Sequence, residues 1–324
     1  MGRYLLRRLI QSVPLLLGIT ILIFLLLQAT PGGPLAMSEN PASSGRVTAE
    51  TLSRLRARYG LDDPMYIQYL NWLKGTVQGD WGSSFNTGRP VLTMVAERLP
   101  TTLQLTGLSL LVTLLIALPI GLISAVKQYS WFDYLATSFS FFGISIPGFW
   151  MALMLVYVFA FQFDWLPNAG LTDPRHSYQG WEAIVDRGKH LIMPVAVLSL
   201  TSTASLTRYL RASMLDVIGQ DYIRTARSKG LKEQAVVIGH ALRNGAVPMV
   251  TVLALEIPDL FIGAVIVESI FAIPGMGRLF IESANLRDYP VLMGILLIAS
   301  ALVIASNLIA DVVYGWLDPR ISLK

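Results

Sequence analysis

Two carboxylic acids stand out because they lie in a stretch of sequence that is otherwise almost entirely apolar. Glu256 and Asp259 are three residues apart, and Glu268 follows in the same run. A spacing of three places the first two side chains on one face of a helix. A charge at the centre of a membrane costs at least about 2.5–3.5 kcal/mol, so such residues normally face a pore or a partner. We interpret Glu256, Asp259 and Glu268 as candidates for a polar path through a membrane; a protonated or partner-paired structural carboxylate is the alternative.

No pattern typical of an enzyme accompanies these acids. The histidines, His176, His190 and His240, are far apart, and neither an HExxH motif nor a GxSxG elbow occurs. Gly188 and Lys189 lack the flanking residues of a phosphate-binding loop. The chain has no cysteine, which excludes disulfides and Cys-based metal sites. We therefore predict no catalytic residue, no metal site and no cofactor in this chain, so any ATP-driven work must be done by a partner that binds ATP and Mg.

The composition indicates a protein that crosses a membrane several times. Hydrophobic residues make up 53% of the 324 residues and charged residues 14%, against about 25% charged in ordinary soluble domains. About 20 apolar residues in a helix cross the roughly 30 Å of hydrocarbon in a bilayer, and all 25 Lys and Arg lie outside the apolar runs. We predict an all-α polytopic membrane protein with six transmembrane helices, at about 9–28, 103–125, 132–161, 191–207, 246–271 and 290–312.

The distribution of basic residues predicts the orientation of these spans. Lys and Arg are denser in segments 1–8, 126–131, 208–245 and 313–324 than in the alternate segments, and the 208–245 loop alone carries seven. The positive-inside rule therefore places both termini in the cytoplasm. The first span is too long for the core of a secretion signal, so we interpret it as an anchor. Topology explains the net charge of +4 without a nucleic-acid partner.

The segments between the spans predict the domain organisation. We divide the chain into residues 1–28, with the N-terminal tip and first span; 29–102, an extracytoplasmic helical subdomain; and 103–324, a five-helix core with the cytoplasmic loop at 208–245. Within 29–102, Asp63, Pro64 and Gly75 are typical of the cap, first position and end of a helix. In the second outside segment, 162–190, we expect a structured loop with one short helix around Trp181–Arg187.

The cytoplasmic loop contains the polar stretch DYIRTARSKGLKEQAVVIGHALRN, residues 221–244. Ala226 and Gly230 are four apart, which would place two small residues on one helix face and let another protein approach the backbone. Arg224, Arg227, Lys229 and Lys232 would form a charged rim around that face. Leu231, Val236, Val237 and Leu242 could pack the segment onto the spans. A docking surface and a merely solvated loop both remain open at this point.

A series of motifs resembles one family of membrane proteins. RTARSKG at Arg224–Gly230 is similar to the cytoplasmic loop signature, EAA followed by xxxG, of permeases in ATP-binding-cassette (ABC) importers. DYIRTARSKGL with HALRN resembles the dipeptide and oligopeptide branch of that family. So do YGLDDP with GDWGSS, ERLPTTLQL, FAIPGMGRL, RDYP and WLDPRI. With the N-terminal RYLLRRLIQSVPLLLGITILIFLLLQATPGGP, these strings run in order from residue 3 to 321.

The resemblance implies a type I ABC importer permease in the bacterial cytoplasmic (inner) membrane. Its partners would be a second, homologous permease in a heterodimer, two cytoplasmic ABC ATPases, an extracytoplasmic substrate-binding protein and membrane lipid. Residues 221–232 would be the coupling helix that docks in the ATPase. The coupling residues implied are Asp221, Tyr222, Arg224, Thr225, Ala226, Arg227, Lys229, Gly230 and Leu231.

The acids of the fifth predicted span depart from the mainly neutral residues expected in this family. Glu256 and Asp259, together with Pro258, stand at those positions. An acidic path could select a cationic ligand, a basic peptide or a metal chelate. We therefore expect di- or oligopeptides or a related small solute as cargo, with a metal-chelate or glutathione importer as the alternative. A self-sufficient secondary transporter that relays protons or cations is a further, different class.

Overall fold

The computed structural model describes residues 2–30, 60–246, 249, 252–253 and 264–317, and this part of the chain is built from helices. The elements, in chain order, are α1 (Gly2–Gln28), α4 (Met65–Val77), α5 (Val91–Val126), α6 (Trp131–Ser145), α7 (Gly148–Leu155), the π-helix η1 (Val156–Gln162), α8 (Trp181–Ile218), α9 (Asp221–Ser228), α10 (Glu233–Ala235), the π-helix η2 (Val236–Leu242), α11 (Arg243–Gly245), α13 (Met276–Asn285) and α14 (Tyr289–Leu317). The predicted all-α fold class is confirmed.

Four of these helices are long and apolar enough to cross a membrane: α1, α5, α8 and α14. They contain the predicted spans 9–28, 103–125, 191–207 and 290–312. The predicted span 246–271 lies mostly outside the described residues, so the number of six spans stays a prediction. The chain is a multi-pass membrane protein.

The predicted span 132–161 is not one straight helix but two helical arms that meet at a break near its middle. α6 ends at Ser145 and α7 begins at Gly148, and the two arms are bent by 98°. Pro147 disfavours helical backbone in the preceding residue, and Ile146 is accordingly extended, with φ −87° and ψ 123°. By contrast Pro14, Pro119 and Pro194 lie inside continuous helices.

The helix ends of the outer segments also differ from prediction. α4 begins at Met65, with Pro64 in the cap position and no side-chain cap from Asp63. It continues past Gly75 to Val77 and ends where Gly79 adopts a φ of +86°. The short helix predicted around Trp181–Arg187 is instead the first two turns of the 38-residue α8, because Gly188 does not interrupt it.

The core lies where α5 and α8 run against each other. Small and hydroxyl-bearing side chains line this contact, and they let two membrane helices approach closely. A Cβ on Gly121 of α5 would lie 3.1 Å from Leu210 of α8. Near the start of α8, Arg187 donates twice to the Oε1 atom of Gln104, at 3.0 and 2.6 Å. The buried polar residues of the two helices are Thr102, Thr106, Ser109, Thr113 and Ser124 on α5, and His190, Ser199, Ser202, Thr203 and Thr207 on α8.

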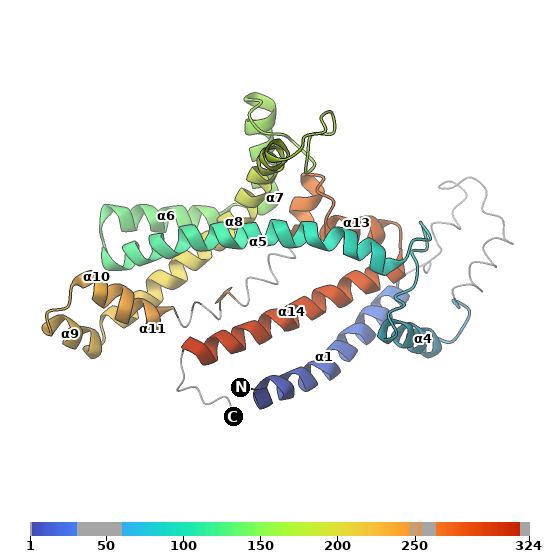
Figure 1. Cartoon of the computed structure of the whole chain (residues 1–324), viewed down its shortest axis with the longest axis horizontal. Coiled ribbons are helices and arrows are strands. Elements are labelled where there is room, and N and C mark those ends of the chain that lie inside the picture. Colours follow the sequence, from blue (N-terminus) through green and yellow to red (C-terminus); the bar gives the residue numbers. More distant parts are fainter. Residues whose placement is uncertain (1, 31–59, 247–248, 250–251, 254–263, 318–324) are drawn as a thin grey trace.

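The helices separate two ends of the molecule. α9, α10 and α11 lie together at one end, beside the last turns of α5, whereas α4 and α13 lie toward the other (Figure 1). α1 and α14 run side by side in opposite directions, and Arg8 of α1 donates to Asp311 of α14 at 2.9 Å. The first turn of α1 and the last turn of α14 therefore point toward the end that carries α9 (Figure 1).

Candidate functional site

α9 is a short amphipathic helix held against the end of the core. Ile223 is fully buried and Ala226 nearly so. They pack in one cluster with side chains of α5, α8 and η2, including Ala125, Leu210 and Met214. Asp221 in the first turn and Arg227 in the last both complement the helix dipole. The helix ends where Gly230, with a φ of +76°, turns the chain back, a conformation that favours glycine.

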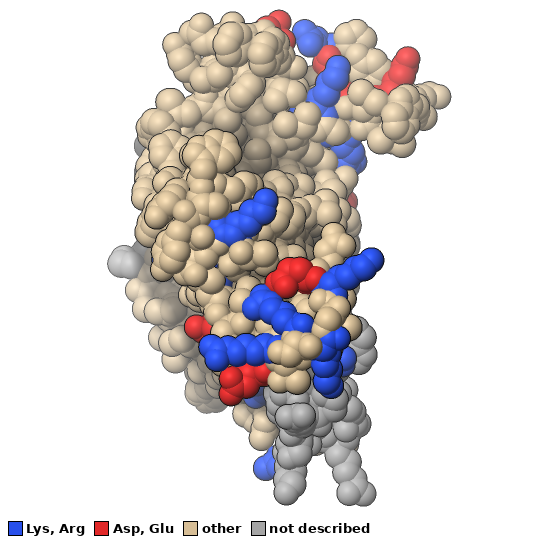
Figure 2. Space-filling view, turned by 90° about the vertical axis from the view of Figure 1, so that its left-hand side faces the viewer, with Lys and Arg blue, Asp and Glu red and all other residues tan. Residues whose placement is uncertain are grey.

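The opposite face of α9 is polar and open to solvent. The side chains of Asp221 and Arg224 are 99% and 74% exposed. Tyr222, Thr225 and Ser228 are also exposed. Basic side chains gather over the end of the molecule formed by α9 to α11, interspersed with a few acidic ones (Figure 2). We call the side chains of Asp221, Tyr222, Arg224, Thr225 and Ser228 the outer face of α9.

The structure corrects the predicted arrangement of small residues. Ala226 points into the chain's own core, so it does not offer its face to another protein. Gly230 lies in the turn after the helix, where nothing surrounds the position of a Cβ. Leu231 is 44% exposed and does not pack on the spans, whereas Val236 and Val237 are buried as predicted. Leu242 is partly buried against the same cluster.

An ion pair that was not anticipated closes the turn after α9. Arg227 donates from Nε and from a terminal nitrogen to the two oxygens of Glu233, at 3.1 and 2.6 Å. The guanidinium hydrogen bond holds the pKa of the Glu233 carboxyl below its ordinary value. Arg227 therefore lies in a bridge between α9 and α10 and not on an open charged rim. The signal in the sequence was weak, because the pairing spans six residues across a glycine turn.

The end of the loop is anchored by the HALRNG stretch. Asn244 donates to the hydroxyl of Tyr222 at 3.0 Å, which ties α11 to the start of α9. Ser213 of α8 donates to the carbonyl of Gly245 at 2.8 Å. A Cβ on Gly245 would lie 2.6 Å from the sulfur of Met214, so a larger residue there would displace the Met214 side chain. The whole loop is thus one packed unit, not a solvated connection.

Of the three acids in the fifth predicted span, Glu268 is the one that lies within the described residues. Glu256 and Asp259 lie outside the described residues. Glu268 is completely buried, and its carboxylate accepts from the Thr102 hydroxyl at 2.6 Å and from backbone N–H groups at the start of α13, including Arg278 at 3.0 Å. These contacts give Glu268 a structural environment between α5 and α13. Its place on a translocation path stays a prediction.

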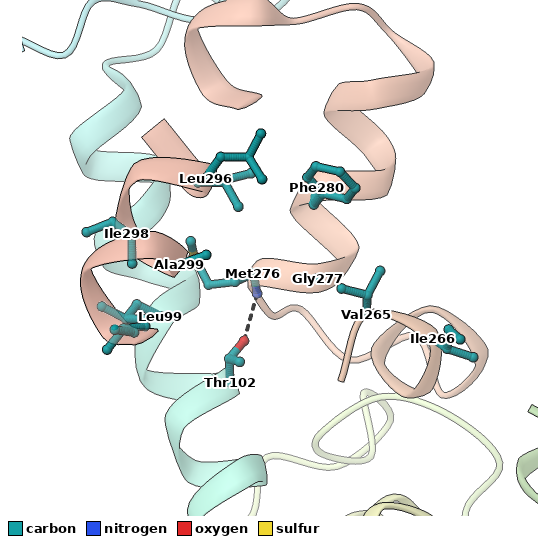
Figure 3. A pocket seen from close by; sticks show the side chains of 12 residues that line it. Leu99, Thr102, Val265, Ile266, Met276, Gly277, Phe280, Leu296, Ile298 and Ala299 are labelled. Carbon is teal, nitrogen blue, oxygen red and sulfur yellow. Dashed lines mark hydrogen bonds between the residues drawn. The ribbon is translucent and has the colours of Figure 1, made fainter. Parts of the chain in front are cut away.

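The same junction explains the glycines of FAIPGMGRL. Thr102 also accepts from the backbone N–H of Met276 at 2.8 Å, next to a cavity of about 360 Å³ with mostly apolar walls (Figure 3). A Cβ on Gly275 would collide with the Glu268 carboxylate, and one on Gly277 with the backbone of Val265. The motif therefore packs α13 against α5.

The outer segments contain two further polar contacts. Asp288, at the start of α14, is buried and accepts from the hydroxyl of Ser84 and, at 3.0 Å, from the backbone N–H of Phe85. In the 163–180 loop, Arg175 makes two side-chain hydrogen bonds to Asp173, and this lowers the pKa of the Asp173 carboxyl. No cluster of three or more metal-ligating His, Cys, Asp or Glu side chains occurs within the part of the chain that the structure describes.

The histidines occupy different surroundings, and one departs from expectation. The expected position for each is at the surface or the membrane interface, yet His190 is buried, and its Nδ1 lies 2.9 Å from the carbonyl of Asp186, one helical turn earlier in α8. His176 is exposed, stacks on Tyr178 and lies beside Asp173. His240 is exposed on η2.

Comparisons with known proteins cover the whole chain. Residues 117–323 match the family described as "Binding-protein-dependent transport system inner membrane component", and residues 1–106 match its N-terminal membrane component. The oligopeptide transport system permease protein AppB of Bacillus subtilis is 44% identical over 322 residues, 99% of each chain. The dipeptide transport system permease protein DppB of Alkalihalophilus pseudofirmus is 35% identical over 336 aligned positions, 98% of each chain.

A solved structure shares the fold. The inward-facing MetNI methionine ABC transporter contains a chain that matches 70% of this protein and 97% of its own length, with a TM-score of 0.56 and 14% identity. At that identity the similarity concerns the fold alone.

Proposed function

Because the chain belongs to the family of inner membrane components of binding-protein-dependent transport systems, it is a permease subunit of an ABC importer, and we propose that it carries di- or oligopeptides across the bacterial cytoplasmic membrane. Relatives named as oligopeptide and dipeptide permeases align with nearly its whole length. Family membership favours this function over a self-sufficient secondary transporter. A metal chelate or glutathione is the alternative cargo.

We propose that the complete importer contains this chain, a second homologous permease, two ABC ATPases that bind ATP and Mg, and an extracytoplasmic substrate-binding protein. Surrounding lipid completes the assembly. The coupling segment, residues 221–232, would dock on an ATPase through the outer face of α9. The observation that carries this proposal is the two-sided character of α9, with Ile223 and Ala226 buried in the chain's own core and Asp221 and Arg224 exposed.

This arrangement fits the transfer of force. A helix whose inner face is packed into the core must take the core with it when its outer face is pushed. Closure of the ATPases on ATP would therefore move α9 as part of a rigid body and switch the permease pair between inward-open and outward-open states. The chain itself needs no catalytic group for this step.

Thr225→Trp tests the docking. Thr225 lies on the outer face of α9, so a bulky indole there should block contact with the ATPase while leaving the buried side of the helix intact. We expect the variant to insert normally but to lose most ATPase on co-purification, and to lose ATP hydrolysis stimulated by the loaded binding protein.

Leu135→Trp is the matched control. Leu135 is 50% exposed on α6, outside the outer face of α9, and already apolar. This variant should retain the ATPase. Normal ATPase recovery and stimulated hydrolysis in Thr225→Trp would show that the outer face of α9 is not the contact.

The outer segments would form the landing surface for the binding protein. α4 belongs to the predicted outside segment 29–102, the 163–180 loop to segment 162–190, and α13 to a third predicted outside segment, 272–289. The buried contact of Asp288 with Ser84 holds two of these segments together, which supports a preformed surface. Cross-linking from a cysteine at the exposed Arg175 to the binding protein tests this assignment.

We further propose that Glu256 and Asp259 line the translocation path and meet a positive group of the cargo. None of the Lys and Arg residues lies in the predicted fifth span, so this chain offers no cation next to them along that helix. Replacement of both by Gln and Asn should preserve assembly and basal ATP hydrolysis while reducing transport of a Lys-containing tripeptide more than that of trialanine. Failure to assemble would indicate pairing with the second permease, and an equal effect on both peptides would exclude a role in selectivity.

A further inference from the structure

A buried ion pair joins α6 to α8 close to the coupling segment. Asp133 of α6 is 2% exposed. Arg211 of α8 donates from Nε to one of its carboxylate oxygens at 2.6 Å and from a terminal nitrogen to the other at 2.7 Å. This two-pronged geometry fixes the relative orientation of the two side chains as well as their distance.

The same carboxylate also holds the end of α5. Ser124 in the last turn of α5 donates to Asp133 at 2.7 Å. The backbone N–H of Tyr129, in the turn between α5 and α6, donates at 2.9 Å. One side chain therefore accepts four hydrogen bonds, from α5, from the turn between α5 and α6, and from α8. We call Asp133, Arg211, Ser124 and the Tyr129 N–H the α6–α8 joint.

The joint lies next to the helix that leads into the coupling segment. Arg211 is seven residues before Ile218, the last residue of α8, a distance of about 10 Å at 1.5 Å per residue. Only Gly219 and Gln220 separate α8 from α9. On the same stretch of α8, Leu210 and Met214 belong to the same buried cluster as Ile223 and Ala226 of α9.

α6 has no comparable attachment to α9 through the core. The cluster that contains Ile223 includes residues of α5, α8 and η2, with no residue of α6 among its described members. Closer to the outer end of α6, Gly143 approaches Ala204 of α8, where a Cβ would lie 3.2 Å from the Ala204 side chain. Toward the start of α6, the charged joint holds α6 to α8 by paired hydrogen bonds, and farther along α6 the guanidinium of Arg208 of α8 lies over the ring of Phe141, 4.7 Å from its centroid.

We propose that the α6–α8 joint is the link that makes α6 move with α9 when the ATPases close. This inference rests on the proposed function of α9. Without the joint, the end of α8 would still move with α9 through the shared core, but α6 could lag behind. Asp133 and Arg211 are then positioning residues for transport, which act through the helices and touch neither cargo nor ATP.

The absence of cysteine in this chain allows the test to be made by spin labelling. Labels go on exposed residues: Gln234 in α10, beside the coupling segment but outside it; Leu135 in α6; and Ile309 in α14. Electron–electron distances are measured for the pairs 234–135 and 234–309 in the complete importer. Each pair is compared without nucleotide and after trapping with ATP and vanadate.

In the wild-type joint, trapping should shift the 234–309 distance and leave the 234–135 distance unchanged. The variant Asp133→Leu with Arg211→Met removes both charges together, which avoids an isolated buried charge. In that variant the 234–135 distance should shift or broaden on trapping. Peptide transported per ATP hydrolysed should fall by about fivefold or more, the lower end of typical coupling effects.

Arg211→Lys gives a second test if the double variant does not assemble. Lysine keeps the charge but lacks the rigid fork of the guanidinium, so it should give a smaller change in the same direction. The control is Arg8→Met with Asp311→Leu, which removes an ion pair between α1 and α14, away from α9. It should leave the 234–135 distance and the transport ratio unchanged.

The outcomes separate the inference from the proposed function. An unchanged 234–135 distance and transport ratio in the joint variants, with a normal shift of 234–309, would overturn the role of the joint and leave the docking of α9 intact. No shift of 234–309 in the wild-type importer would overturn the docking of α9 and the inference with it.

Discussion

The carboxylate of Glu233 is about half exposed, yet it is held by both prongs of the Arg227 guanidinium. The pair spans the turn in which Gly230 has a positive φ. Exposed ion pairs add little to global stability, so the effect of this pair should be local. The pair fixes the direction in which the chain runs from the end of α9 into α10 and η2.

This geometry predicts a pH dependence of the turn. The pKa of Glu233 is lower in the folded turn than its ordinary value of about 4.3. Its contribution is therefore fully present above that ordinary value and is lost as the pH falls through the lowered pKa. A nitroxide on residue 234 should be ordered at neutral pH and become more mobile as the pH falls through the lowered pKa of Glu233.

Glu233→Gln is the control for this titration. Glutamine cannot ionise, so the label should already be mobile at neutral pH and should not respond further to acid. A label that keeps its wild-type order in Glu233→Gln would show that the ion pair does not hold the turn.

At the scale of the element, α9 is held to the core by two buried side chains, Ile223 and Ala226. Ile223 is completely buried, and Ile→Ala substitutions in cores cost about 2–5 kcal/mol. Because α9 has only eight residues, it is too short to be stable by itself. Ile223→Ala should therefore release α9 from the core before it unfolds the long helices.

Hydrogen exchange measures this release directly. Amides of α9 should exchange faster in Ile223→Ala, while those of α5 and α8 should stay protected. The control is Leu231→Ala, a partly exposed position where the cost should be within about 0.5 kcal/mol. Equal protection of α9 in both variants would argue against Ile223 as its anchor.

The long helices could be predicted from composition because a span needs only an apolar run of sufficient length. Their ends could not. Trp181–Arg187 contains enough charge to suggest a separate surface helix, but it continues smoothly into α8. The sequence also does not predict which way the Ala226 side chain points, because a small residue is suited both to a close contact with another protein and to a tightly packed core.

Partners distant in sequence limited what could be predicted about the site. The outer face of α9 lies within the predicted coupling segment, but Glu233 and the α6–α8 joint were not foreseen. Asp133 and Arg211 are 78 residues apart in the sequence. Asp133 also lies at the edge of an apolar run, where a carboxylate is expected to be at the membrane interface. The acidity of Glu268 is plain in the sequence, but its contacts with Thr102 and α13 depend on the fold and cannot be predicted from it.

At the scale of the whole molecule, the orientation in the membrane can be tested with single cysteines. Val77 at the end of α4 and Arg175 in the 163–180 loop are both strongly exposed. Cysteines there should react in intact cells with a maleimide that does not cross membranes. A cysteine at Gln234 should react only after the cells are opened. The reverse pattern would invert the topology, with α9 outside and unable to meet an ATPase.

The bend at Pro147 has a consequence for how the protein enters a bilayer. α6 has 15 residues and rises about 22 Å, less than the roughly 30 Å of hydrocarbon. Where the helix stops, carbonyls of its last turn and N–H groups of the first turn of α7 lose their helical partners. Pro147 and Gly148 are exposed on the chain, and lipid tails offer no hydrogen bonds to such groups. A lone subunit would thus expose backbone carbonyl and N–H groups without hydrogen-bond partners to lipid. Newly made copies should therefore be short-lived in the membrane until a neighbouring protein or a water-filled space supplies partners for these groups.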